Sequence, residues 1–185
     1  MKRTEIYELF KNLIYEKLKI IEKEKNGYFA LAWGFEANAI GQVGETFIKN
    51  IFNNNGYNVD LKSIHDEYDI MIDDKKIEIK TAKVGYNNAF QFNGINPKYN
   101  YDLIICIGIE LNSIKYRLFK SEQIFYDHKK RSNLIKYSVK DKIIEKKLTS
   151  MNPGNEVNKK LTLSTNHMYD DIENMFDKII EKLNS

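Results

Sequence analysis

The chain has 185 residues, of which 42% are hydrophobic and 30% are charged, and its formal net charge is +3 at pH 7. This balance predicts a folded globular protein and excludes an extended, highly charged chain. No stretch is long and apolar enough to span a membrane, and residues 1–5 do not resemble a signal peptide. The single cysteine, Cys106, lies in an apolar run and has no partner for an intrachain disulfide. We therefore expect a cytoplasmic protein without a membrane segment.

The N-terminal region predicts a helix followed by an aromatic loop. Residues 4–25 carry apolar side chains at helical spacing, and Asn26-Gly27 is a typical stop signal. Residues 28–35 are rich in aromatic side chains but show no clear period. We interpret them as a loop packed against the core rather than a contact surface that presents Trp33.

A second helix is predicted from about residue 37 to residue 54, with a buried stripe of Ile40, Val43, Phe47 and Ile51. Gly41 and Gly44 lie close to Glu45 along this helix, whereas Ile48 falls with Gly41 and Glu45 on a different face from the stripe. Because a glycine inside a helix costs about 1 kcal/mol relative to alanine, the glycines suggest that another group approaches closely.

Residues 56–61 predict a strand that leads into a β-hairpin of residues 68–73 and 76–81, in which polar and apolar side chains alternate. Asp73-Asp74-Lys75-Lys76 supplies a polar turn between the two strands.

The hairpin brings charged side chains together on one face. Alternation places Glu78 and Lys80 on the same face of the second strand. If the turn is centred on Asp74 and Lys75, Asp69 lies opposite Lys80 and diagonal to Glu78, at separations of about 5 and 7–8 Å. Carboxylate oxygens are ligands that Mg²⁺ prefers, together with waters and phosphate oxygens. A half-solvated hairpin also shows alternating charges, so the pattern alone leaves a simple solvated face open.

The pattern Asp69-x8-Glu78-x-Lys80 resembles the active-site signature of the PD-(D/E)XK nuclease superfamily, which includes most type II restriction endonucleases. Tyr68 stands where some members have a proline. The stretch Gly41-Gln-Val-Gly-Glu45 resembles the first core helix of the superfamily, which in many members lends a glutamate to the metal site. Glu45 matches that glutamate, with an ordinary surface residue as the alternative.

The resemblance implies a role for each matched residue. Asp69 and Glu78 would bind Mg²⁺, or Mn²⁺ as a substitute, together with the backbone carbonyl of Ile79. Lys80 would orient the attacking water or stabilise charge on the phosphate. Glu45 would be an additional carboxylate at the metal.

Beyond the hairpin, three strands are predicted at residues 88–92, 103–109 and 114–119, and a short helix from Ser121 to about residue 126. Residues 129–160 hold ten Lys/Arg against three Asp/Glu, a basic segment that suits either phosphate binding or plain solvation. Residues 161–164 predict one more strand and residues 166–183 an amphipathic helix.

Taken together, residues 1–185 predict a single α/β nuclease domain whose restriction endonuclease-like core is a mixed central sheet of about five strands with helices on both faces. The core covers about residues 37–126. Residues 1–36 form an N-terminal helix and loop, and residues 127–185 a C-terminal basic segment and helix.

By resemblance, the expected activity is Mg²⁺-dependent endonucleolytic cleavage of double-stranded DNA, as in a type II restriction endonuclease. The chain would act as a homodimer or as the cleavage subunit beside a larger sequence-recognising subunit, as in heterodimeric type IIS enzymes. The alternatives are a DNA repair, recombination or phage nuclease, and a nucleic-acid-binding module that has a nuclease-like fold but does not cut.

Overall fold

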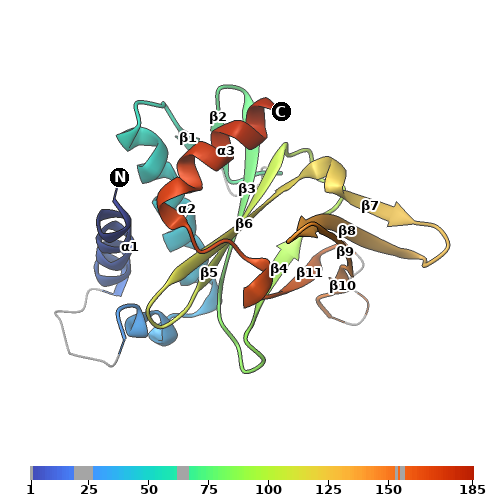
Figure 1. Ribbon diagram of the computed structural model, residues 1–185, viewed down its shortest axis with the longest axis horizontal. Coiled ribbons are helices and arrows are strands. Elements are labelled where there is room, and N and C mark those ends of the chain that lie inside the picture. Colours follow the sequence, from blue (N-terminus) through green and yellow to red (C-terminus); the bar gives the residue numbers. More distant parts are fainter. Residues whose placement is uncertain (1, 19–26, 62–66, 153, 155–156) are drawn as a thin grey trace.

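The computed structural model describes residues 2–18, 27–61, 67–152, 154 and 157–185 (Figure 1). Within these residues, five strands form the central sheet in the order β1-β2-β3-β5-β6. β3 and β5 are parallel, and the other neighbouring pairs are antiparallel, so the sheet is mixed, as predicted. The strands are β1 (Asp60–Leu61), β2 (Ile70–Ile72), β3 (Lys75–Lys83), β5 (Leu103–Ile109) and β6 (Ile114–Lys120).

The interior strand β5 is buried along its whole length. This burial confirms the prediction from its continuous apolar run, because a strand covered on both faces needs apolar side chains at successive positions. Cys106 lies in this strand with a fully buried thiol, and burial raises its pKa. It is a small core residue in this structure.

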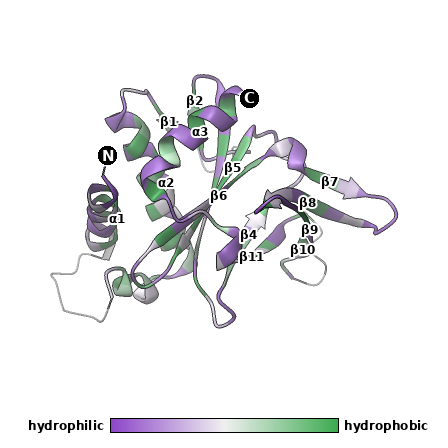
Figure 2. Cartoon of the chain, viewed as in Figure 1, coloured by the Kyte–Doolittle hydropathy of each residue, from purple (hydrophilic) through white to green (hydrophobic). Residues whose placement is uncertain are grey.

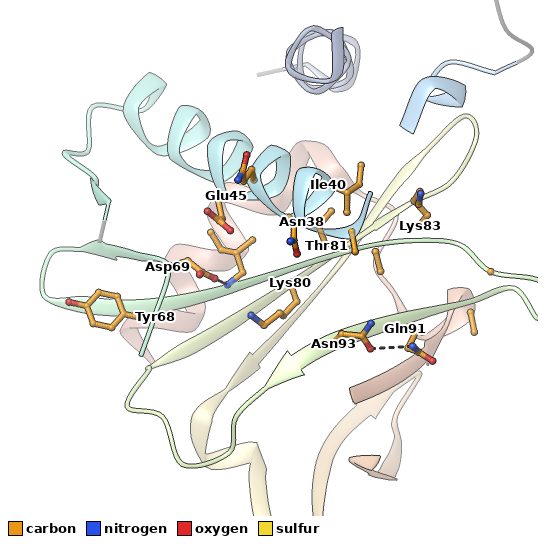
Figure 3. Close-up of a pocket in the computed structure, with 17 residues that line it drawn as sticks. Asn38, Ile40, Glu45, Tyr68, Asp69, Lys80, Thr81, Lys83, Gln91 and Asn93 are labelled. Carbon is orange, nitrogen blue, oxygen red and sulfur yellow. Dashed lines mark hydrogen bonds between the residues drawn. The ribbon is translucent and has the colours of Figure 1, made fainter. Parts of the chain in front are cut away.

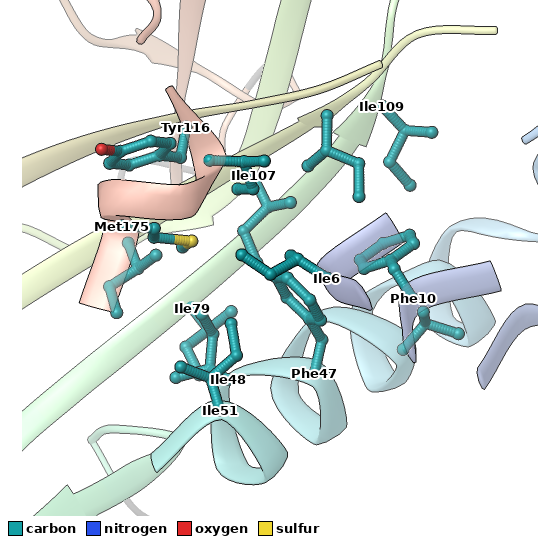
Figure 4. Packing of buried hydrophobic residues seen from close by; sticks show 14 of the residues in the cluster. Ile6, Phe10, Phe47, Ile48, Ile51, Ile79, Ile107, Ile109, Tyr116 and Met175 are labelled. Carbon is teal, nitrogen blue, oxygen red and sulfur yellow. The ribbon is translucent and has the colours of Figure 1, made fainter. Parts of the chain in front are cut away.

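Helices cover one face of the central sheet. α2 (Ala37–Asn54) packs against β3, and α1 (Arg3–Leu18) packs against α2. α3 (Met175–Asn184) packs against β6. Figure 4 shows side chains from the two N-terminal helices meeting those of the sheet in one apolar cluster. The 3-10 helix η1 (Ala30–Gly34) belongs to the aromatic loop, where Phe29, Leu31, Ala32 and Phe35 are buried, as predicted.

The opposite face is covered by strands, so the expectation of helices on both faces is wrong. Two three-stranded sheets of the described residues form a second apolar cluster against this face. One has the order β10-β11-β4 and contains β4 (Ala89–Ile95), β10 (Thr149–Ser150) and β11 (Lys159–Ser164). The other has the order β7-β8-β9 and contains β7 (Ile124–Asp127), β8 (Ser132–Val139) and β9 (Lys142–Lys147).

Two expected helices take other conformations. Ser121 begins a short 3-10 helix, η2 (Ser121–Gln123), after which the chain continues as strand β7 rather than as a helix. The helix expected over residues 166–183 starts only at Met175, after the 3-10 helices η3 (Thr165–His167) and η4 (Ile172–Asn174). The cause lies between these turns, where Tyr169 exchanges backbone hydrogen bonds with Tyr116 of β6 and is held extended.

Other predicted elements agree more closely with the structure. α2 has the predicted bounds, and β5 and β6 form the predicted hairpin. The first helix begins as predicted, but residues 19–25 of it lie outside the described residues. Figure 2 shows hydrophobic residues along the central strands and hydrophilic ones at the tip of the β7–β8 hairpin. None of the described helices is long and apolar enough to cross a membrane.

Candidate active site

The predicted hairpin is present as β2 and β3, but its register differs from the expected one by two residues. Asp73 and Asp74 form the turn with φ of 45° and 65°, and Ile72 pairs with Lys75. Aspartate tolerates this left-handed conformation, which suits the twist of a two-residue hairpin. Continued outward, the observed register sets Asp69 opposite Glu78 rather than Lys80. A shift of two residues leaves every side chain on its predicted face.

Asp69 lies where β2 stops pairing with β3. Its N–H donates to the carbonyl of Ile77 at 3.0 Å, and its Oδ2 accepts from the N–H of Ile79 at 2.6 Å. The carboxylate thus replaces the next backbone acceptor, and the edge of β3 beyond this point has no strand beside it in the described sheet. Because the N–H and C=O of one strand residue point to the same edge, the Ile79 carbonyl also faces this open edge.

Glu78 and Lys80 lie on the other side of β3 from the helices. Lys80 Nζ forms an ion pair with Glu78 Oε1, and both side chains are largely buried. Burial raises the pKa of Glu78 to about 7, and the negative charges of Asp69 and Glu45 add to this rise against the lowering effect of Lys80. Burial alone would lower the pKa of Lys80, but the attraction of Glu78 and Asp69 outweighs it and raises the pKa. Lys80 therefore stays positively charged at neutral pH.

α2 brings Glu45 to the same region because Gly44 permits a close approach to β3. A Cβ at Gly44 would clash with Thr81 Oγ1 and would lie 3.1 Å from Thr81 Cβ. This contact confirms the expected close approach at Gly44, whereas a Cβ at Gly41 would meet nothing within 4 Å. The prediction for Ile48 is wrong, because its side chain is fully buried in the core.

These groups line a cleft of about 650 Å³ (Figure 3). One wall is the N-terminal half of α2, the middle is the open edge of β3, and the other wall is β4. Asp69, Lys80, Ile79 and Glu45 all line the cleft, so the structure brings these four predicted residues together. Glu78 lies beneath them, with 6% of its surface exposed.

Sequence reasoning missed the polar walls of the cleft. α2 contributes Asn38 and Gln42, β3 contributes Lys83, and β4 contributes Gln91 and Asn93. The signal for β4 was present, since polar and aromatic residues alternate from Ala89 to Asn93. His65, which lies close to the hairpin in sequence, is outside the described residues.

The donors at the open edge are the hard oxygens that Mg²⁺ prefers. Asp69 and Glu78 supply carboxylates and Ile79 a carbonyl, and the raised pKa of Glu78 records a repulsion between carboxylates that a cation would relieve. Among the described residues, no three His, Cys, Asp or Glu side chains are close enough to surround an ion on their own. Mg²⁺ typically needs only one or two carboxylates, with waters and substrate phosphate oxygens completing its shell. The donor set therefore fits this ion.

Comparison with models of known protein families gives no match, and comparison with curated proteins gives none either.

Proposed function

We propose that this chain is a Mg²⁺-dependent endonuclease that hydrolyses phosphodiester bonds of double-stranded DNA. The observation that carries the proposal is the gathering of Asp69, Glu78 and Lys80 on one region of β3, beside an open strand edge and inside a cleft. A plain solvated hairpin would leave its charges in water, whereas Glu78 is almost completely buried and shifted in pKa. Buried, perturbed titratable groups in a cleft are typical of active sites.

Each residue has a role in this proposal. Asp69, Glu78 and the Ile79 carbonyl would hold the ion, with Glu45 reaching it from α2. A bound Mg²⁺ polarises a phosphoryl group and lowers the pKa of an attacking water. Lys80 carries a positive charge beside Glu78, so it can hold the water in line with the phosphorus or stabilise charge on the phosphate oxygens.

Within this class, we propose the role of a type II restriction endonuclease or its cleavage subunit. The site leaves little of the chain for an elaborate recognition region, and only three arginines are present in 185 residues. Specific double-strand cleavage would then need either a second copy of the chain or a larger subunit that reads the sequence. Repair or recombination nucleases share the same chemistry and would differ in the DNA structures they cut.

The test is cleavage of supercoiled plasmid with Mg²⁺ or Mn²⁺ by wild type, Asp69→Asn and Glu78→Gln. Asparagine retains an oxygen for the Ile79 N–H but loses the charge, so the fold should persist while the ion is lost. We expect cleavage to fall at least about a hundredfold, because a metal supplies several kcal/mol and each 1.36 kcal/mol is tenfold in rate.

Asp74→Asn is the matched control, because it makes the same chemical change on the exposed turn of the same hairpin, at a position whose φ of 65° asparagine also tolerates. It should cut like wild type. Where cleavage requires a sequence-reading partner, the assay includes that partner. An Asp69→Asn protein that cuts at the wild-type rate would sink the assignment, and a wild type that binds DNA without cutting would favour the non-cleaving module.

A further inference from the structure

The β4 wall of the cleft has a polar surface over an aromatic base. Phe90 and Phe92 point inward and are buried, whereas Gln91 and Asn93 are exposed and line the cleft. In the neighbouring strand β11, Thr162 pairs with Gln91 and is also exposed, so the polar face continues away from the cleft.

The backbone is irregular at the point where this wall meets the catalytic residues. Gly94 has φ of +77°, a conformation that favours glycine, and a Cβ there would lie 3.9 Å from Lys80 Nζ. The pairing of β4 with β11 shifts register in the same place, between Lys159 and Leu161. Bulges of this kind reorient side chains and are common beside active sites. The irregularity sets Asn93 directly beside the position of Lys80.

The two amides are already aligned with each other. Gln91 Nε2 donates to Asn93 Oδ1 at 3.2 Å, and Figure 3 shows this hydrogen bond at the mouth of the cleft. The bond leaves the Gln91 carbonyl oxygen as an acceptor and the Asn93 amide nitrogen as a donor. An adjacent acceptor and donor complement the major-groove edge of adenine, which presents the N6 amino group and the N7 acceptor.

We propose that Gln91 and Asn93 contact an adenine in the base pair next to the scissile phosphate and select it. The inference rests on the proposed function, and it assigns the β4 wall as the surface that selects the bond to be cut. Uncharged amides are poor partners for phosphates compared with the lysines of the chain, and Lys83 at the far end of the cleft is already held by the Phe35 carbonyl at 3.0 Å. The readout covers one or two base pairs rather than a long sequence.

The experiment uses duplexes with a randomised central segment. The full chain, with its partner where cleavage needs one, cuts the library in Mg²⁺, and the product ends are sequenced. For wild type we expect adenine to be enriched about fivefold or more at one position beside the cut, since a bidentate amide contact discriminates by about 1–3 kcal/mol. Gln91→Ala and Asn93→Ala should flatten that position. Asn12→Ala, an exposed amide on α1, is the matched control and should keep the enrichment.

The outcomes separate this inference from the function on which it rests. A slower Asn93→Ala enzyme that keeps the wild-type end composition would show a structural effect and overturn the inference. Wild-type ends without any preference beside the cut would overturn it too, while cleavage itself would stand. If wild type leaves the library intact, the proposed function fails and the inference falls with it. Thermal unfolding of each variant, at an unchanged midpoint, shows that the exposed substitutions leave the fold intact.

Discussion

The Asp69 carboxylate has a structural role that is separable from metal binding. It accepts the hydrogen bond of the Ile79 N–H at the place where β2 leaves the sheet. Removing the acceptor would leave this N–H unsatisfied, at a cost of about 1–3 kcal/mol if it stays buried. The same carboxylate keeps the edge of β3 open beside the Ile79 carbonyl. A small polar residue at this position therefore ends the strand pairing and exposes the site in one step.

Sequence reasoning handled these residues well for a simple geometric reason. Side chains in a strand repeat every two residues, so an error of two residues in the hairpin register left Asp69, Glu78 and Lys80 on a common face. What alternation could not predict was the burial of Glu78, because that depends on strands far along the chain that cover this face. Gln91 and Asn93 were missed for the same reason, since only the fold brings β4 beside β3.

Glu45 is the residue whose role is most directly open to measurement. If it binds the ion, Glu45→Gln should raise the Mg²⁺ or Mn²⁺ concentration needed for half-maximal cleavage, because one negative charge at the metal is lost. Its influence on the pKa of Glu78 shows that the two carboxylates sense each other. The measurement is a metal titration of cleavage, with Glu122→Gln on η2 as a remote carboxylate control. A Glu45→Gln titration that overlays the wild type would assign it a role away from the metal.

At the scale of elements, patterning predicted α2, β5 and β6 because each carries one uninterrupted period. It failed for β7, β8 and β9, where exposed lysines dominate the composition. The alternation in β8 is present, with Ile135 and Tyr137 buried and Lys136 exposed between them. In a segment with ten basic residues, the charge obscured the strand period and suggested an unstructured surface. These strands cover the face that was expected to carry helices.

The packing of α2 on β3 gives a stability prediction with an internal control. Gly44→Ala should destabilise the protein by about 1–3 kcal/mol, because its methyl group would be forced into Thr81. Gly41→Ala should instead stabilise it by up to about 1 kcal/mol, because a methyl group there meets nothing within 4 Å and alanine favours the helix. Urea unfolding of both variants measures the difference.

A second substitution tests whether Thr81 is the cause. Thr81→Ala removes the clashing hydroxyl, so it should recover part of the stability lost in Gly44→Ala. Equal shifts for the two glycine variants, or no recovery in the double variant, would contradict the close approach and leave the position of Glu45 without its structural explanation.

For the whole molecule, the charge distribution bears on how DNA is held. The outer face of the β7-β8-β9 sheet carries exposed Lys136 and Lys147, opposite the face that packs on the core. Lysine contacts to phosphates position a protein but carry no sequence information. Arginine, which makes the commonest specific contact to guanine, occurs only three times, and Arg117 is buried. The chain therefore has the means to hold DNA and few means to read a long sequence.

We accordingly predict that the isolated chain binds DNA weakly, with strong salt dependence and little difference between unrelated duplexes. The logarithm of affinity should fall with the logarithm of salt concentration at about −0.9 per phosphate neutralised. If the β7-β8-β9 sheet contacts phosphates, Lys136→Gln with Lys147→Gln should reduce the slope by nearly two such units. Lys2→Gln with Lys182→Gln, at the two helical ends of the chain, makes the same charge change elsewhere and should leave the slope unchanged.

The measurement is a binding titration of the purified chain alone, at several salt concentrations, against a panel of unrelated duplexes. Weak and uniform binding would mean that specific double-strand cleavage requires self-association on DNA or a larger reading subunit, because a readout of one or two base pairs beside the cut cannot select a rare site. Tight, sequence-selective binding by a monomer at physiological salt would refute the need for a partner. A self-sufficient enzyme would then have to read its sequence through surfaces other than the arginines and the β4 wall.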